Sequence, residues 1–187
     1  MTGTQITLIV VGVIVLLIIF YVISVYNKLV NARNKVRNQW AQIDVQLKRR
    51  ADLIPNLVET VKGYAKHENE TLTAVIDARN KYVNASSINE EIESSNELSG
   101  ALSRLFALTE SYPDLKANQN FISLQNDLKD TEDKISYARQ FYNDTVQTYN
   151  DMVEQFPSNI IASIFKFKLF DFFKTEGTDR EAPKVQF

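Results

Sequence analysis

The residues with the clearest chemical potential are one histidine and two short runs of acidic side chains. His67 begins the sequence HENET, which resembles the zinc-binding pattern HExxH but lacks its second histidine. The acidic runs have the composition of paired acids or metal ligands: Glu90, Glu91 and Glu93, and Asp130, Glu132 and Asp133. These acids fall among the polar positions of amphipathic helices, so we interpret them as solvated helix faces and His67 as an isolated, exposed helical side chain.

Other catalytic and cofactor chemistry lacks the residues it requires. The absence of cysteine excludes disulfides, thiolate metal sites and cysteine nucleophiles. The Glu-x-x-His motif of di-iron helical bundles is missing, and five glycines leave little material for a phosphate-binding loop. The sequence therefore predicts no enzyme activity, no cofactor, no metal and no small-molecule substrate. An enzyme stays open as a third hypothesis, which would need a buried cluster of acids.

The chain begins with a long apolar run that predicts a membrane anchor over residues 1–27. Residues 6–25 contain sixteen Ile, Leu, Val or Phe side chains among twenty positions, and residues 1–27 carry no charged side chain. About 20 apolar residues are enough for a helix to cross the hydrocarbon core. The alternatives are a cleaved signal peptide and a very hydrophobic core helix. A signal peptide is disfavoured because no basic residue precedes the run and Ser24-Val25-Tyr26 is a poor cleavage site.

The distribution of charge predicts the orientation of the chain. No acidic residue comes before Asp44, and the N-terminal MTGTQ carries no basic residue. Four basic residues follow the apolar run: Lys28, Arg33, Lys35 and Arg37. Because basic flanks prefer the cytoplasm, we expect a short N-terminus outside a bacterial cell membrane and residues 27–187 inside it. Residues 28–50 carry a net charge of +6, which suits anionic lipid, whereas the net charge of −9 over residues 51–158 argues against nucleic acid.

Apolar spacing in the rest of the chain predicts long helices. Val36, Trp40, Ile43 and Leu47 follow the 4-3-4 spacing of helices packed in a bundle or coiled coil. Similar patterns cover residues 54–82, 88–111 and 113–156, separated by a polar loop at 84–87 and by Pro113, and Pro157 ends the last one. The sequence therefore predicts an all-α protein. A transmembrane helix precedes an antiparallel four-helix bundle over residues 28–156, and residues 157–187 form a short helix (159–164) and an aromatic tail.

A corner between two helices is predicted within the sequence QLKRRADLIPN. Pro55 would lie in the first turn of a helix capped by Asp52, where its missing N–H has no intrahelical partner. Lys48, Arg49 and Arg50 would lie in the last turn of the preceding helix, where cations meet the negative end of the helix dipole. The alternative is one long helix kinked at Pro55, because the apolar phase nearly survives across it. We prefer the corner, because four antiparallel helices bury more apolar surface.

The C-terminal segment mixes aromatic and basic residues between positions 160 and 174. Seven of them are candidates for contacts: Phe165, Lys166, Phe167, Lys168, Phe170, Phe172 and Phe173. An aromatic patch of this kind is not left in water. Three interpretations remain open, namely a strap that covers a groove of the bundle, a segment lying in the lipid headgroup layer, and an interface with another protein.

Several stretches of the chain resemble the LemA family of bacterial membrane-anchored helical proteins. They are YNKLVNARNKVRNQWAQIDVQLKRRADLIPNLVETVKGYAKHE (26–68), LFALTESYPDLKANQNFISLQNDL (105–128), ARQFYNDTVQTYN (138–150), FPSNIIA (156–162) and APKVQF (182–187). The resemblance covers nearly the whole chain behind the anchor and implies a cytoplasmic four-helix bundle on a single N-terminal span. It implies no established enzyme activity and no catalytic residues, and the Phe/Lys tail is more aromatic than the family leads us to expect.

Two functional hypotheses follow, neither of them catalytic. The first is a scaffold or adaptor whose anchor holds an acidic helical surface at the inner leaflet, with the lipid bilayer and another membrane protein as partners. The alternative is a self-assembling, membrane-shaping homo-oligomer, in which bundles tile side by side and the tail contacts a neighbour or lipid. Large closed assemblies in mild detergent would favour tiling, whereas a monodisperse monomer would argue against it.

Overall fold

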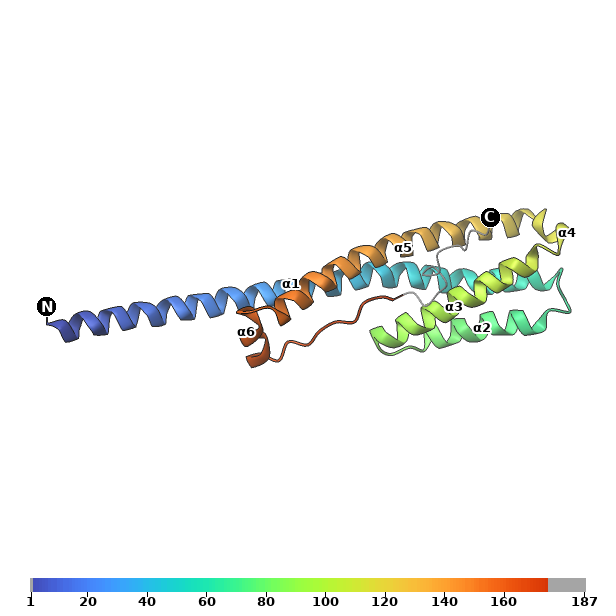
Figure 1. The fold of residues 1–187 in the computed structure, drawn as a ribbon. Helices are drawn as coiled ribbons and strands as arrows, with labels where there is room; N and C mark the ends of the chain where they lie inside the picture. Colours follow the sequence, from blue (N-terminus) through green and yellow to red (C-terminus); the bar gives the residue numbers. More distant parts are fainter. Residues whose placement is uncertain (1, 175–187) are drawn as a thin grey trace, which may run out of the picture. The chain divides into compact units, whose positions relative to one another are not determined.

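The structure is a computed structural model that describes residues 2–174, and every regular element in that range is an α-helix (Figure 1). The helices are α1 (Gly3–Lys62), α2 (Asn69–Val83), α3 (Ile88–Thr109), α4 (Pro113–Lys116), α5 (Gln119–Glu154) and α6 (Ser158–Ile164). For the described residues, the prediction of an all-α protein is confirmed.

The chain divides into two compact units. Among the described residues, the anchor unit contains 2–41 and 140–172, and the core unit contains 42–139 with Phe173 and Lys174. The long helices α1 and α5 each supply one part to both units.

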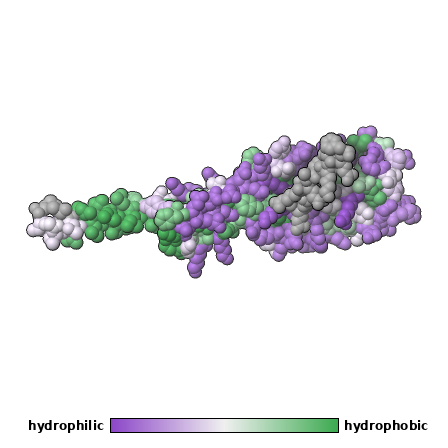
Figure 2. Space-filling model, viewed as in Figure 1, coloured by the Kyte–Doolittle hydropathy of each residue, from purple (hydrophilic) through white to green (hydrophobic). Residues whose placement is uncertain are grey.

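The anchor unit contains a helical stretch with the character of a membrane span. Among the described residues, α1 is the one helix long and apolar enough to cross a membrane, and none of its most apolar stretch is buried within the protein. Large apolar side chains from Leu8 to Phe20 are about half exposed or more, and Figure 2 shows the corresponding hydrophobic surface. Behind this stretch α1 turns its apolar face to the protein, where Val25 and Leu29 pack with Ile161 and Ala162 of α6.

The core unit is built around an apolar core shared by five helices. Fully buried side chains come from α1 (Ile54, Leu57, Val61), α2 (Val75), α3 (Leu98, Leu105) and α4 (Leu115). Phe121 and Leu128 of α5 complete the core at 1% and 3% exposure. Burying side chains of this size contributes roughly 1.5–3 kcal/mol each. The antiparallel order of a four-helix bundle stays a prediction.

The corner predicted around Asp52 and Pro55 is wrong, because α1 continues to Lys62 with Pro55 inside it. Proline lacks the N–H that would bind the carbonyl oxygen four residues earlier, which is the oxygen of Ala51. That oxygen instead accepts a hydrogen bond of 2.9 Å from Nε of Arg79, on α2. A side chain thus replaces the missing backbone donor, and the helix passes through the proline. The first break falls later, at residues 63–68.

The break at residues 63–68 also corrects the description of His67. This side chain is exposed, as expected, but it lies in a turn between α1 and α2 and not on a helix.

The other breaks follow from capping. The loop at 84–87 is present, and Ser87 caps α3 by accepting a hydrogen bond from the N–H of Glu90. The fourth predicted helix, by contrast, is interrupted after Lys116. The side-chain oxygen of Asn118 accepts hydrogen bonds from the N–H groups of Asn120 and Phe121, at 2.9 and 3.1 Å, and so starts α5 as a new helix.

Candidate functional site: a buried arginine and a C-terminal strap

Two residues of the acidic runs singled out in the sequence, Glu90 and Asp130, are engaged in local contacts. Glu90 accepts hydrogen bonds from the N–H and hydroxyl of Ser86, at 2.8 and 2.9 Å, and these bonds hold the pKa of Glu90 below its usual value. The carboxylate of Asp130 pairs with Lys134 at 2.8 Å, which lowers the pKa of Asp130. Among the described residues, no three His, Cys, Asp or Glu side chains gather in a way that could hold a metal ion.

Arg50, predicted to end a helix, is the most deeply buried charged side chain of the core unit, at 1% exposure. Its Nη1 donates to the carboxylate of Glu132 at 2.7 Å and to the hydroxyl of Ser99 at 2.8 Å. Its Nη2 donates to the hydroxyl and carbonyl oxygens of Ser95, at 2.8 and 3.1 Å. One guanidinium therefore ties α3 and α5 to α1, with the fork geometry that arginine provides and lysine does not.

A second arginine shares the same carboxylate. Nη2 of Arg139 lies 3.9 Å from Glu132, and its guanidinium stacks over the ring of Phe173 at 4.3 Å. Burial lowers the pKa of Arg139, and the nearby charge of Arg50 adds to that effect. Two largely buried guanidiniums thus face one half-exposed carboxylate, so this interior carries an excess of positive charge.

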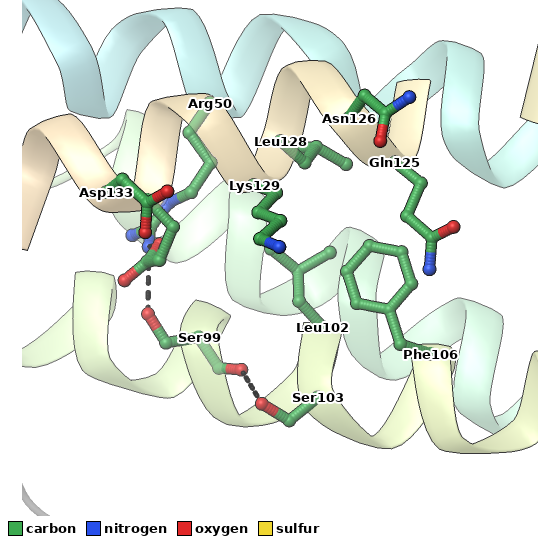
Figure 3. A pocket seen from close by; sticks show the side chains of 11 residues that line it. Arg50, Ser99, Leu102, Ser103, Phe106, Gln125, Asn126, Leu128, Lys129 and Asp133 are labelled. Carbon is green, nitrogen blue, oxygen red and sulfur yellow. Dashed lines mark hydrogen bonds and ion pairs between the residues drawn. The ribbon is translucent and has the colours of Figure 1, made fainter. Parts of the chain in front are cut away.

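A groove of about 610 Å³ opens beside this cluster, between α3 and α5 (Figure 3). Arg50, Ser99 and Glu132 line its polar end, and Leu102 and Phe106 line its apolar end. The arginine and serine at the polar end are hydrogen-bonded to each other. Arg50 and Lys129 in its lining are balanced by Glu132 and Asp133, and the donors of Arg50 are used to hold helices together.

The predicted tail begins with a helix stop in the anchor unit. Lys166 has a φ of 56°, in the left-handed region that favours glycine. The N–H groups of Lys166 and Phe167 donate to the carbonyls of Ser163 and Ala162, at 3.2 and 2.9 Å. This pair of bonds is the Schellman motif, and it turns the chain out of α6 into an extended segment. We call this segment, residues 165–172, the strap.

Polar side chains of α5 hold the backbone of the strap. Asn150 donates to the carbonyl of Phe170 at 2.9 Å and accepts from its N–H at 3.0 Å, so an amide side chain pairs with the strap as a neighbouring strand would. The hydroxyl of Tyr149 donates to the carbonyl of Lys168 at 2.8 Å. Tyr142 donates to the carbonyl of Asp171 at 3.1 Å, and burial raises the pKa of Tyr142 to about 12.

The aromatic side chains of the tail are placed unequally. Phe167 and Phe170 are half-buried and stack against Arg33 and Tyr149, at 5.1 and 5.2 Å. Phe165 stacks on Tyr26 at 4.7 Å and keeps 49% exposure. Lys166 and Lys168 are exposed, Phe172 is half-buried, and Phe173 is 3% exposed in the core unit. Phe165, Phe167, Phe170 and Phe173 each contact a side chain of α1 or α5, and the three interpretations of the tail stay predictions.

The other predicted residues separate into exposed and engaged side chains. Lys28, Lys35 and Arg37 are exposed, whereas Arg33 lies over Phe167. Lys48 and Arg49 are exposed and lie 2.7 and 3.5 Å from Asp44 and Asp127, and Asp52 and Pro55 are exposed on α1. Of the five residues of the predicted corner, Arg50 alone joins the buried network.

Sequence reasoning missed Arg79, Glu132, Tyr142 and Asn150 as structural determinants. A signal exists for Asn150 and Arg50, because each is a polar residue at a position where the apolar spacing of its helix continues. Ile43, Leu47, Arg50 and Ile54 keep the 4-3-4 spacing, which predicts that position 50 faces the core. For Arg79 the sequence offers no comparable signal.

Comparisons of the sequence with known proteins identify a family and several relatives. The sequence model of the LemA family matches residues 39–187. The chain is similar to Protein LemA of Metamycoplasma hominis, with 26% identity over 180 residues, which cover 90% of this chain and 80% of the relative. It is also similar to the magnetosome protein MamQ of Magnetospirillum gryphiswaldense and to MamQ 2 of Paramagnetospirillum magneticum, each with 25% identity. The alignments cover 79% and 80% of this chain, and 64% of each MamQ protein.

Proposed function

Because the chain belongs to the LemA family, we propose that it works without catalysis, as a scaffold that a single spanning helix holds at the inner face of a bacterial membrane. The scaffold presents the acidic surface of the core unit to another membrane protein. The basic flank of the span, with Lys28 and Lys35 exposed, contacts anionic lipid.

The observation that carries this proposal is the change of surroundings along α1 in the anchor unit. From Leu8 to Phe20 its large apolar side chains are exposed, and from Val25 onward one stripe of the same uninterrupted helix is buried against protein. An exposed apolar run of this length is stable in lipid and not in water.

The surface of α2 and α3 supports the choice of a scaffold. Asp77 on α2 and Glu93 on α3 are exposed, and Glu97 pairs with Lys81 at 2.7 Å across the two helices. Arg50, the most deeply buried cation among the described residues, uses its guanidinium donors to join helices. A rigid helical surface with exposed acids suits recognition of a basic partner, since charge complementarity sets specificity and encounter rate.

The orientation is tested with single cysteines, which the natural chain lacks. Thr4→Cys lies near the N-terminus and Thr73→Cys on α2, and both positions are exposed. An impermeant maleimide added to intact cells should label Thr4→Cys and should label Thr73→Cys only after the membrane is opened. Labelling of Thr73→Cys in intact cells would reject the cytoplasmic placement.

The scaffold role is tested by photo-crosslinking in cells. A photoreactive residue at Glu93 should give a defined adduct with another protein, whereas the same residue at the exposed Val45 of α1 serves as the matched control. Adducts between two copies of the chain would favour the alternative, a tiling homo-oligomer. If neither position gives an adduct in the membrane fraction, the scaffold proposal fails.

A further inference from the structure

Helix α6 packs on α1 at the end of the apolar run (Figure 1). Ile161 and Ala162, on the inner face of α6, are 4% and 1% exposed and cluster with Val25 and Leu29, and the partly buried Val22 packs against them. Because a helix rises 1.5 Å per residue, positions 22 and 29 lie about 10 Å apart along α1. Helix α6 therefore packs directly beside the last residues of the apolar run, Val22 and Val25.

The face of α6 turned away from α1, with the residues just before and after α6, carries large apolar side chains that the protein leaves uncovered. Ile160 and Ile164 lie four residues apart on α6 and are 52% and 67% exposed, and Phe156, in the turn before α6, is 79% exposed. Phe165 and Leu169, at the start of the strap, add 49% and 50% exposed side chains. We call these five residues the outer patch of α6. Clustered apolar side chains of this size mark a surface that contacts lipid or another protein.

Charge distinguishes lipid from protein as the occupant. No acidic residue lies between Glu154 and Asp171, and Lys166 and Lys168 are exposed beside the outer patch. On α1, no acidic residue precedes Asp44. Lysine side chains at this depth reach outward to headgroups while their methylene stems stay on apolar surface. Each cation near an anionic leaflet contributes about 1 kcal/mol of attraction.

We propose that the outer patch of α6 inserts into the headgroup layer of the membrane that α1 spans, so that anionic phospholipid is its partner. The inference rests on the proposed membrane anchor and adds a second, lateral lipid contact to it. The headgroup layer is roughly 5–8 Å thick on each side of the hydrocarbon core, and α6 packs on α1 where the apolar run ends. Apolar faces of interfacial helices bury to a similar depth.

The test uses tryptophan fluorescence and lipids brominated in the upper part of their acyl chains. Trp40 is the single tryptophan of the chain, so Trp40→Phe gives a silent background. Ile164→Trp in that background is reconstituted as the full chain into vesicles of phosphatidylcholine and phosphatidylglycerol. We expect brominated vesicles to quench its emission about twofold or more relative to plain vesicles. Ile160→Trp is the second probe, and far-UV circular dichroism confirms that each variant is folded.

Two control positions separate failure of this inference from failure of the anchor. Ile18→Trp lies in the candidate span and should be quenched by bromines deep in the acyl chains, and Ile76→Trp on α2 should not be quenched by either lipid. If Ile18→Trp is quenched while both α6 probes are not, the outer patch does not contact lipid and the inference is overturned. If Ile18→Trp is not quenched, the anchor itself fails.

The occupant is checked against the other candidate, a second copy of the chain. Lipid contact predicts that the emission of Ile164→Trp is independent of protein density in the vesicles and that quenching falls when phosphatidylglycerol is omitted. An α6 probe that is unquenched, but whose emission shifts to shorter wavelength as protein density rises, would assign the outer patch to self-association and overturn the inference.

Discussion

Both units place an arginine over a phenylalanine of the C-terminal segment, but in different surroundings. In the anchor unit Arg33 lies 5.1 Å from the ring centre of Phe167, which is half-buried. In the core unit Arg139 lies 4.3 Å from Phe173, which is 3% exposed. Cation–π contacts gain strength as water is removed. An arginine–phenylalanine pair therefore contributes more to stability in the core unit than in the anchor unit.

The units also differ in what surrounds these contacts. The anchor unit has an apolar cluster around Val25, Leu29 and Ile161, and polar side chains of α5 hold its strap by the backbone. The core unit has a large apolar core and a guanidinium network inside it. A buried charge is costly unless it is fully paired, whereas bonds to a partly exposed strap cost less to break. Substitutions that break these contacts should therefore lower the free energy of unfolding strongly in the core unit and less in the anchor unit.

Removal of Arg50 is expected to have the largest effect. Arg50→Ala should lower the free energy of unfolding by about 3 kcal/mol or more, because it leaves a cavity and unpaired serine groups in the core. The neighbouring Arg49→Ala is the matched control, with a side chain 44% exposed and an expected loss below about 1 kcal/mol. Urea unfolding in detergent micelles, followed by far-UV circular dichroism, measures both. Equal losses would contradict a structural role for Arg50.

In the anchor unit, Tyr142 should make the strap sensitive to high pH. Burial raises the pKa of Tyr142 to about 12, whereas an unfolded tyrosine titrates near 10. The stabilisation is therefore complete below about pH 10 and is lost as pH rises toward 12, with a total of about 2 kcal/mol. Tyrosinate absorbance of the natural chain minus that of Tyr142→Phe should show one group with a midpoint near 12. A midpoint near 10 would mean that the strap does not cover this hydroxyl.

The passage of α1 through Pro55 is tested by a double-mutant cycle in the core unit. Arg79→Met removes the donor to the carbonyl of Ala51 and should cost about 1–3 kcal/mol. Adding Pro55→Ala supplies the missing backbone N–H, so the same Arg79→Met change should cost clearly less in that background. Equal costs in both backgrounds would show that Arg79 does not substitute for the helical hydrogen bond.

The smallest expected effect concerns the helix stop before the strap. Lys166→Gly should raise stability by about 0.5 kcal/mol, since glycine accepts the left-handed conformation but has more freedom when unfolded. Lys168→Gly, in the extended strap, is the control and should give no gain. Fluorescence of Trp40, which stacks on Tyr142 at 5.4 Å in the same unit, reports the urea midpoint. A loss with Lys166→Gly would argue against the Schellman turn.

Much of the fold is readable in local patterns. Ser87 and Glu90 have the spacing of a helix cap, and the apolar run at the N-terminus has the length of a span. Local rules fail at Pro55, because whether a helix tolerates proline depends on a donor supplied from elsewhere in the fold. Arg79 supplies that donor from α2. The turn between α1 and α2 comes later in the chain than the corner that the sequence predicted.

The candidate site was harder to predict than the fold. The basic cluster at 48–50 was expected to lie at a helix end, yet one of its members enters the core because it shares the phase of Leu47 and Ile54. The strap shows no periodicity, since α5 side chains pair with its backbone and not with its side chains. Backbone pairing of this kind leaves no trace in the composition of the strap.

The central claim is that the apolar run of α1 remains in the protein and holds it in a membrane. The most direct measurement is the intact mass of the chain recovered from membranes after an alkaline carbonate wash. The account predicts a species close to 21.4 kDa that stays with the membranes and floats with lipid vesicles. A shorter species that begins behind the apolar run and appears in the soluble fraction would contradict it.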